Sequence, residues 1–147
     1  MSISSVITAI QGVNSGITGI TSAPTTIPGK LHVGQLPMAL CFVGPGEVTR
    51  VSDFTLHFRT FYVRVYVKPI AQDVKPDAGY SEAYTLLQRF VEAYEDDITF
   101  GGAVQHTGRG ARYDPPTFED DGVQVLSYAG TDYHGFQIYV TTKEQIT

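Results

Sequence analysis

Four histidines and one cysteine are the side chains of this 147-residue chain that most often bind metal ions. The histidines lie far apart, and no two have the short spacing with which one helix or strand presents two ligands to one ion. Cys41 is the single cysteine, so neither a cysteine cluster nor an intrachain disulfide is possible. It lies in the apolar run LPMALCFV, where a thiol is typically a small buried group of low reactivity. We therefore expect no metal site and no catalytic cysteine. The four histidines are His32, His57, His106 and His134.

Acidic residues occur in two consecutive runs, Glu95-Asp96-Asp97 and Glu119-Asp120-Asp121. Acid–base catalysis needs two carboxyl groups in different environments across a cleft, which consecutive residues in polar segments do not provide. Such runs are usually solvated, and they also suit contact with a cation or a basic neighbour. The sequence leaves both interpretations open.

Motifs of nucleophilic and phosphate-binding enzymes are missing from the sequence. No G-x-S-x-G elbow is present to hold a catalytic serine. Gly44-Pro45-Gly46 lacks the Lys and Ser or Thr of a phosphate loop, and Gly108-Arg109-Gly110 lacks a strong strand before it and a helix after it. Both are typical of turns, and the second also suits an arginine-bearing loop tip. The sequence predicts that the protein is not an enzyme and uses no cofactor.

Basic and aromatic side chains alternate in one predicted strand, where Arg59, Arg64 and Lys68 lie among Tyr62 and Tyr66. Strand alternation places Arg64 on the same face as the two tyrosines. This is typical of a solvated face of an antiparallel sheet, and it also suits a mildly basic surface for DNA or an acidic neighbour. The aromatic motifs of RNA-binding modules are absent.

Charge is distributed unevenly along the chain, whose net charge is −5. Residues 1–72 carry +3 and residues 73–147 carry −8, and Lys30 is the single charged residue among the first 46. An uncharged third of a chain predicts either a hydroxyl-rich surface or a segment covered by another subunit. We expect no transmembrane helix, because no run of about 18 apolar residues occurs, and no secretory signal at residues 1–20.

Hydrophobic spacing predicts two helices. Apolar residues recur every three or four positions over residues 2–20 and again over residues 78–94. Gly12, Gly16 and Gly19 weaken the first helix, so we expect it to be firm to about residue 11.

Strands are predicted on both sides of the second helix. The run 36–43 predicts a buried strand that ends at Gly44, and residues 50–67 alternate as a long strand. Apolar residues in the long strand change parity near Arg59-Thr60, which predicts a bulge or corner there. Residues 123–128 and 135–142 predict a terminal β-hairpin. We expect a long loop over 103–121 that is mobile in the free subunit and orders on assembly.

The element order is helix, strand, long strand, helix and hairpin in a single domain, residues 1–147. It predicts an α+β fold: a mostly antiparallel sheet with two main helices packed on one face and a terminal β-hairpin.

This layout resembles the tail terminator proteins of long-tailed bacteriophages, the lambda-type proteins that cap the tail tube. The resemblance covers most of the chain as an order of elements, and no catalytic or metal motif contributes to it. It is carried by the apolar helix 2–20, LPMALCFVGPGE (36–47), RTFYVRVYVKPI (59–70), AGYSEAYTLLQRFVEAY (78–94) and YAGTDYHGFQIYVTTKE (128–144).

The resemblance implies a structural virion protein rather than an enzyme. It implies a homohexameric ring that stops polymerisation of the tail-tube protein and joins the tail to a neck or head-completion protein. DNA would pass through the lumen without sequence specificity. Such a protein is assembled in the host cytoplasm, lies at the head-proximal end of the tail and needs no membrane.

The charge separation suits head-to-tail contacts within such a ring. Segments 44–53 and 103–121 are long enough to reach a neighbouring subunit. The candidate interface or lumen residues are Arg59, Arg64, Lys68, Arg109, Arg112, Glu119, Asp120 and Asp121.

Two other functions fit the same residues. One is another joining protein of the phage neck or head, which would also form a ring but bind on the portal side. The other is a small α+β ligand-binding domain or enzyme, which would be monomeric.

Overall fold

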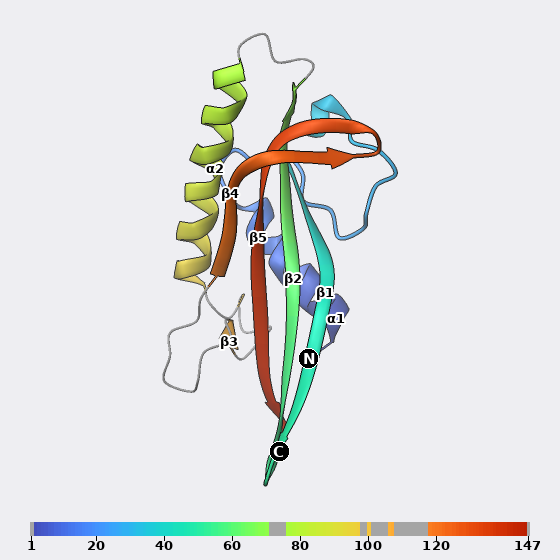
Figure 1. Cartoon of the computed structure of the whole chain (residues 1–147), viewed down its shortest axis with the longest axis vertical. Helices are drawn as coiled ribbons and strands as arrows, with labels where there is room; N and C mark the ends of the chain where they lie inside the picture. Colours follow the sequence, from blue (N-terminus) through green and yellow to red (C-terminus); the bar gives the residue numbers. More distant parts are fainter. Residues whose placement is uncertain (1, 71–75, 98–99, 101–105, 108–117, 147) are drawn as a thin grey trace.

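The computed structural model describes residues 2–70, 76–97, 100, 106–107 and 118–146. Its elements follow the chain as a helix, a short 3-10 turn, two long strands, a second helix and three further strands (Figure 1). They are α1 (Ile3–Ser15), η1 (Val33–Gln35), β1 (Met38–Val51), β2 (Phe54–Pro69), α2 (Pro76–Asp96), β3 (His106–Thr107), β4 (Phe118–Tyr128) and β5 (Thr131–Ile146). This order confirms the predicted α+β fold.

One antiparallel sheet contains the five strands of the described residues. β2 is central, with β1 on one side and β5 on the other. The far edge of β5 pairs with β4 along its first part and with β3 near its end. The β4–β5 hairpin bends so that its distal half crosses the upper end of the sheet, while the lower ends of β1, β2 and β5 extend past the helices (Figure 1).

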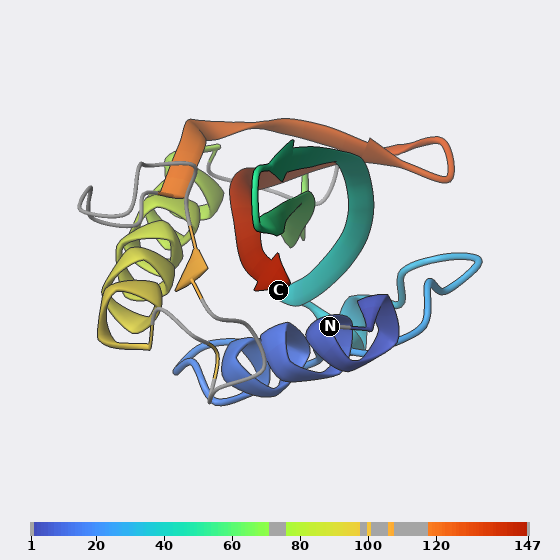
Figure 2. The same cartoon turned by 90° about the horizontal axis from the view of Figure 1, so that it is seen from below.

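Both helices pack on the same face of the sheet, as predicted. Val6 and Ile10 of α1 and Phe90 of α2 are fully buried in one apolar cluster with Val63 and Val65 of β2. Viewed along the strands, α1 and α2 lie beside the strongly twisted sheet and are splayed apart rather than side by side (Figure 2). We call the sheet face that these helices leave uncovered the open face.

A second, smaller cluster closes the upper part of the open face. Met38, Leu40, Tyr66 and Tyr133 are its buried residues. Leu31, from the connector between α1 and β1, packs against them, as do side chains of the β4–β5 hairpin. In the part of the chain that the structure describes, this cluster therefore covers the upper end of the open face.

The α1 helix begins at a serine cap and ends at glycine. The Ser2 hydroxyl accepts a hydrogen bond from the Ser5 amide at 3.1 Å, which satisfies one of the free N–H groups at the start of the helix. The helix ends at Ser15, where Gly16 caps it, so it continues past residue 11 but stops short of the predicted end at residue 20. Burial of its apolar stripe offsets the low helix propensity of Gly12.

The Gly44-Pro45-Gly46 segment does not end the first strand, contrary to the prediction. β1 continues through it to Val51, and the register shifts between Val43 and Gly46. Gly44 is required because a Cβ there would lie 2.7 Å from the Thr60 carbonyl oxygen. Pro45 is tolerated because β1 is an edge strand.

The predicted bulge near Arg59-Thr60 is therefore in the partner strand. Arg59 and Thr60 pair regularly with Thr142 and Thr141 of β5. Side chains of β2 therefore continue to alternate between the two faces of the sheet at this point. The apolar residues themselves change face: Phe58 lies on the open face and Phe61 on the helix face. The parity change marks the point where the sheet extends past the helices.

The predicted loop 103–121 is wrong at its C-terminal end, because β4 begins at Phe118. Phe118 pairs with Val140 and stacks edge-on against Tyr94 at 5.2 Å between ring centroids. Gly122, with φ +73°, accommodates a register shift that lets the strand continue past the acidic run. Residues 108–117 lie outside the described residues, as do most of residues 98–107, so the expected mobility stays a prediction.

A chain of buried polar side chains links α2, α1, the connector and β1. The Tyr94 hydroxyl donates to Asn14 Oδ1 at 2.5 Å, and Asn14 Nδ2 donates to Gln11 Oε1 at 2.8 Å. Gln11 Nε2 donates to the carbonyls of Pro24 at 2.6 Å and Ala39 at 2.9 Å. All three side chains are buried, so each needs these partners in place of water.

Replacing Tyr94 with Phe tests this chain. The Y94F variant leaves the buried Asn14 oxygen without its donor, so we expect the free energy of unfolding to fall by about 1–3 kcal/mol. Urea unfolding followed by circular dichroism measures the change. The matched control is Tyr84→Phe on the exposed side of α2, for which we expect a change within about 0.5 kcal/mol. Equal effects of the two substitutions would show that the chain contributes nothing.

Candidate interaction surface on the open face of the sheet

The central strand β2 places Arg64 in the middle of the open face. Its neighbours Val63 and Val65 point into the helix-side core, so alternation turns Arg64 to the other side. The ladder sets Leu40 of β1 and Gln137 of β5 beside it. Arg64 is half-buried.

Two contacts fix the guanidinium of Arg64. Its Nε donates a short hydrogen bond to Gln137 Oε1. Its Cζ lies 5.2 Å from the centroid of the Phe42 ring, within the range of a cation–π interaction. A guanidinium held in one orientation suits the planar oxygens of a carboxylate or a phosphate.

The Tyr66 phenol lies next to Arg64 at the covered end of the face. Burial raises the pKa of Tyr66, and the hydrogen bond and positive charge of Arg64 oppose part of that rise. Tyr66 therefore stays protonated and neutral at physiological pH, so it adds no negative charge beside Arg64.

A row of aromatic rings continues the surface. Tyr62 and Tyr139 are cross-strand partners whose rings meet edge-on at 5.3 Å between centroids. The Tyr139 hydroxyl donates to Asp121 Oδ2 at 2.5 Å. Because that bond favours the protonated phenol, it raises the pKa of Tyr139. We call Phe42, Tyr62, Arg64, Gln137 and Tyr139 the open-face patch.

The acidic run 119–121 forms one border of this patch. Its three side chains are exposed and belong to β4, so they are held by a strand and not by a loop. Glu119 pairs with Tyr139 in the ladder, and Asp120 Oδ1 accepts from the Gly122 amide at 2.9 Å. With Asp121 bonded to Tyr139, two of the three carboxylates have partners within the chain.

The other predicted basic residues do not join Arg64. Arg59 lies on the helix face, where its Nη1 donates to the Gly44 carbonyl at 3.3 Å. Lys68 comes after a register shift and pairs with His134. His134 is three residues from Gln137 on β5, so alternation places the two on opposite faces of the sheet. Arg109 and Arg112 lie outside the described residues. Of the predicted basic residues that are described, Arg64 is the one on the open-face patch.

Sequence reasoning placed Tyr62, Arg64 and Tyr66 on one face correctly and missed Phe42, Gln137 and Tyr139. Those three belong to neighbouring strands, and their position depends on cross-strand register. The alternation within β5 was a usable signal, since Gln137 and Tyr139 have the opposite parity to the apolar Phe136 and Ile138.

No three His, Cys, Asp or Glu side chains among the described residues come together as candidate metal ligands. In the same part of the chain, no helix has the length and apolar character needed to cross a membrane.

No family model matches the chain, and no curated protein matches it.

Cys41 belongs to the helix-side core and is 5% exposed. Burial raises the pKa of its thiol from 9.0 to about 12. The nucleophilic thiolate is therefore almost absent in the folded chain at neutral pH.

This burial predicts both the reactivity and the pH dependence of Cys41. A disulfide reagent should label Cys41 quickly in urea and very slowly in the native chain. An acid whose pKa is raised on folding stabilises the native state below its unfolded pKa and loses that contribution above it. Between about pH 9 and pH 11 we expect the wild type to lose about 1 kcal/mol per pH unit more unfolding free energy than Cys41→Ala. Parallel pH profiles of the two proteins would contradict this expectation.

Proposed function

We propose that this chain is the subunit of a homohexameric ring that terminates the tail tube of a long-tailed bacteriophage. The ring joins the tail to a neck or head-completion protein, and DNA passes through its lumen. The α+β architecture supports the proposal, because the phage proteins that the sequence resembles have a sheet with flanking helices. The proposed location is the head-proximal end of the tail.

The observation that carries the proposal is the open-face patch. The chain covers the helix face of its sheet and the upper end of the open face, and leaves a fixed guanidinium among aromatic rings on the remainder. Aromatic and arginine side chains are the types that contribute most to protein interfaces. A surface of this composition fits a partner with carboxylates or phosphates better than it fits a substrate, since it is a sheet face and not a cleft.

Ring symmetry explains how one arginine per subunit can matter. An exposed ion pair contributes only about 0–1 kcal/mol. In a closed head-to-tail ring every interface contains the same pair, so one substitution removes it from all interfaces together. The partner of Arg64 is an acidic surface of a neighbouring protein or the phosphates of DNA in the lumen.

Reversing the charge at Arg64 tests the proposal. We expect Arg64→Glu to fold normally by circular dichroism and to fail to form rings in native mass spectrometry and electron microscopy, or to fail to bind polymerised tail tubes. Arg64→Lys is the matched control, because it keeps the positive charge at the same position of β2. Glu119→Arg is the preferred compensating change, since Asp120 and Asp121 have structural hydrogen bonds. Rescue by E119R identifies an acidic protein partner, and absence of rescue favours DNA.

Three results would contradict the proposal in different ways. Normal rings and normal tail binding by Arg64→Glu would exclude the open-face patch as the working surface. A wild-type chain that is monomeric both in solution and on tails would exclude the ring. Binding to filled heads that lack tails, without binding to tail tubes, would identify a neck protein instead.

A further inference from the structure

A groove separates α1 from α2 on the side of the molecule away from the open face. Two cavities of about 280 and 640 Å³ lie along it, and Arg89 borders both. One wall is residues 12–19, and the other is the side of α2 between Glu82 and Asp96, roughly 21 Å of helix. We call this feature the helix groove.

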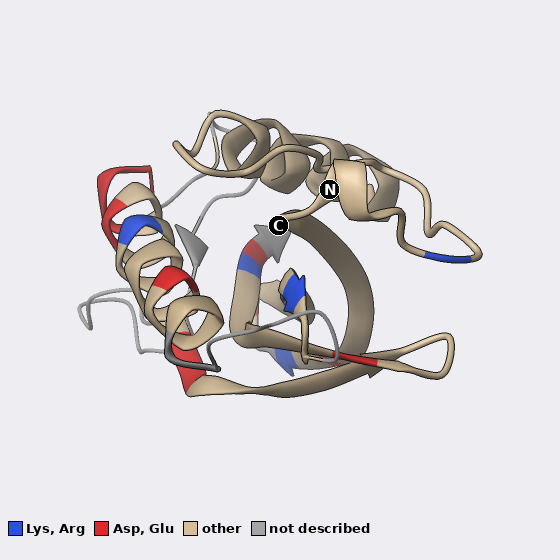
Figure 3. Ribbon diagram, turned by 90° about the horizontal axis from the view of Figure 1, so that it is seen from above, with Lys and Arg blue, Asp and Glu red and all other residues tan. Residues whose placement is uncertain are grey.

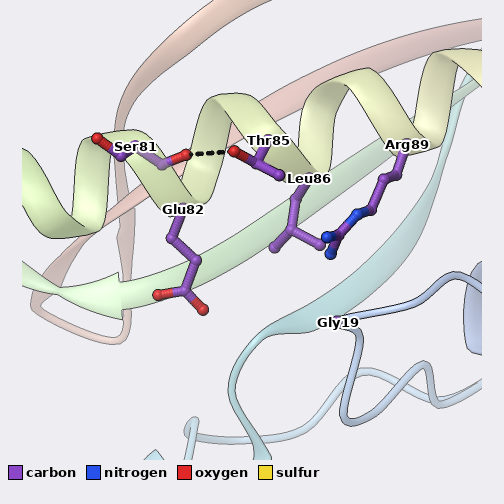
Figure 4. Close-up of a pocket in the computed structure, with 6 residues that line it drawn as sticks. All are labelled: Gly19, Ser81, Glu82, Thr85, Leu86 and Arg89. Carbon is purple, nitrogen blue, oxygen red and sulfur yellow. Dashed lines mark hydrogen bonds between the residues drawn. The ribbon is translucent and has the colours of Figure 1, made fainter.

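The helix groove has an apolar floor and an acidic rim. Ile17 and Leu86 are buried beneath it. Glu82, Leu86 and Arg89 project from α2 toward the segment that contains Gly19, where Arg89 Nη1 donates to the Thr18 carbonyl at 2.9 Å (Figure 4). Glu92 and Asp96 border the larger cavity.

The acidic rim is unfavourable for α2 in isolation. Glu92 and Asp96 are four residues apart on one side of the helix, where like charges repel. Both also lie near the negative end of the helix dipole, and the last turn contains no basic residue. A positive side chain placed in the groove would relieve both effects.

The connector between α1 and β1 presents such a side chain at a rigid tip. The tip is residues 25–30, in which Ile27 is 50% exposed and Lys30 is exposed. Gln11 donates to the carbonyl of Pro24, the residue before the tip, and the Tyr128 hydroxyl donates to the carbonyl of Pro28 within it. A tip held at its base loses little conformational entropy when it binds. We call residues 25–30 the connector tip.

The connector tip and the helix groove lie on opposite sides of the subunit. α2 with its acidic residues is on one side of the molecule, and the loop that contains Lys30 extends from the other (Figures 2 and 3). The connector tip of a chain therefore cannot reach its own groove, whereas the tip of a second copy can. Two different surfaces that meet head to tail generate a ring when the rotation closes.

We propose that the helix groove binds the connector tip of a neighbouring copy of this chain. Ile27 packs on the apolar floor, and the ammonium group of Lys30 lies between Glu92 and Asp96. This assignment rests on the proposed function, because it names the subunit contact of that ring. It also gives a role to the single charge among the first 46 residues.

Gly12 allows the groove to be filled without disturbing the fold. A Cβ at Gly12 would meet no heavy atom within 4 Å, and the helix propensity of Leu is higher than that of Gly. Gly12→Leu therefore blocks the groove, and Gly12→Ala is the matched control with a side chain too short to do so. Lys30→Glu removes the complementary charge at the tip, with Lys30→Arg as the control that keeps the charge.

Sedimentation velocity and native mass spectrometry over a range of concentrations measure the outcome. We expect G12L and K30E each to weaken self-association at least about tenfold, and both controls to associate as the wild type does. Mixing G12L with K30E should yield 1:1 dimers and nothing larger, because one intact groove and one intact tip remain in the mixture. Lys30→Glu combined with Asp96→Lys should recover association.

Each contrary result has a distinct meaning. If G12L and K30E both form wild-type rings, this contact is wrong and the proposed ring is unaffected. The same conclusion follows if a mixture of G12L and K30E forms no dimers. A wild-type chain that stays monomeric at the highest concentration it tolerates overturns this contact. Its binding to tail tubes, measured separately, then decides the proposed function.

Discussion

Three buried polar side chains determine how the two helices lie on the sheet. Tyr94, Asn14 and Gln11 form one hydrogen-bonded chain from α2 through α1 to the carbonyls of Pro24 and Ala39. Apolar packing alone is not directional, so it permits small rotations of α1 and α2 on their sheet. A buried amide left unpaired costs more than such a rotation gains, so the hydrogen bonds select one arrangement. Tyr94 remains a donor at any physiological pH, because burial raises the pKa of its phenol well above the ordinary value.

The same chain connects the core to the surface of the N-terminal third. Gln11 bonds both to β1 and to the residue that precedes the connector tip, so the position of α1 also fixes the base of that tip. Because α1 and α2 are splayed, they leave a groove that Arg89 bridges at one point. The groove and the connector tip are therefore two consequences of one buried network. A substitution in the network would shift both, which distinguishes it from a substitution at Lys30.

Sequence reasoning predicted what depends on local periodicity and missed what depends on pairing. The apolar stripe that includes Val6 and Ile10 predicted α1. Alternation along β2 placed Arg64 on the face opposite to that of Val63. Gly44-Pro45-Gly46 has the composition of a turn, yet β2 pairs on both sides of it and converts it to a bulge. Phe118 begins a strand because it pairs with the edge of β5 and packs against the ring of Tyr94. Both partners are distant in sequence. The open-face patch was predicted in part for the same reason, since Phe42 and Gln137 depend on register.

The helix-side core beneath the open-face patch fixes the backbone positions of the patch residues. β2 is hydrogen-bonded along both edges, and its inward residues Val63 and Val65 are fully buried. An outward residue between them therefore has a fixed backbone, and contacts with Gln137, Phe42 and Tyr66 set the side chain of Arg64. A charge positioned in this way loses little entropy on contact, which offsets the small energy of an exposed ion pair. Arg59 lies on the same strand as Arg64, but on the helix face. Its side chain bonds to the Gly44 carbonyl, so it does not belong to the open-face patch. Strand alternation thus places one arginine of β2 against the bulge of β1 and the other on the open-face patch.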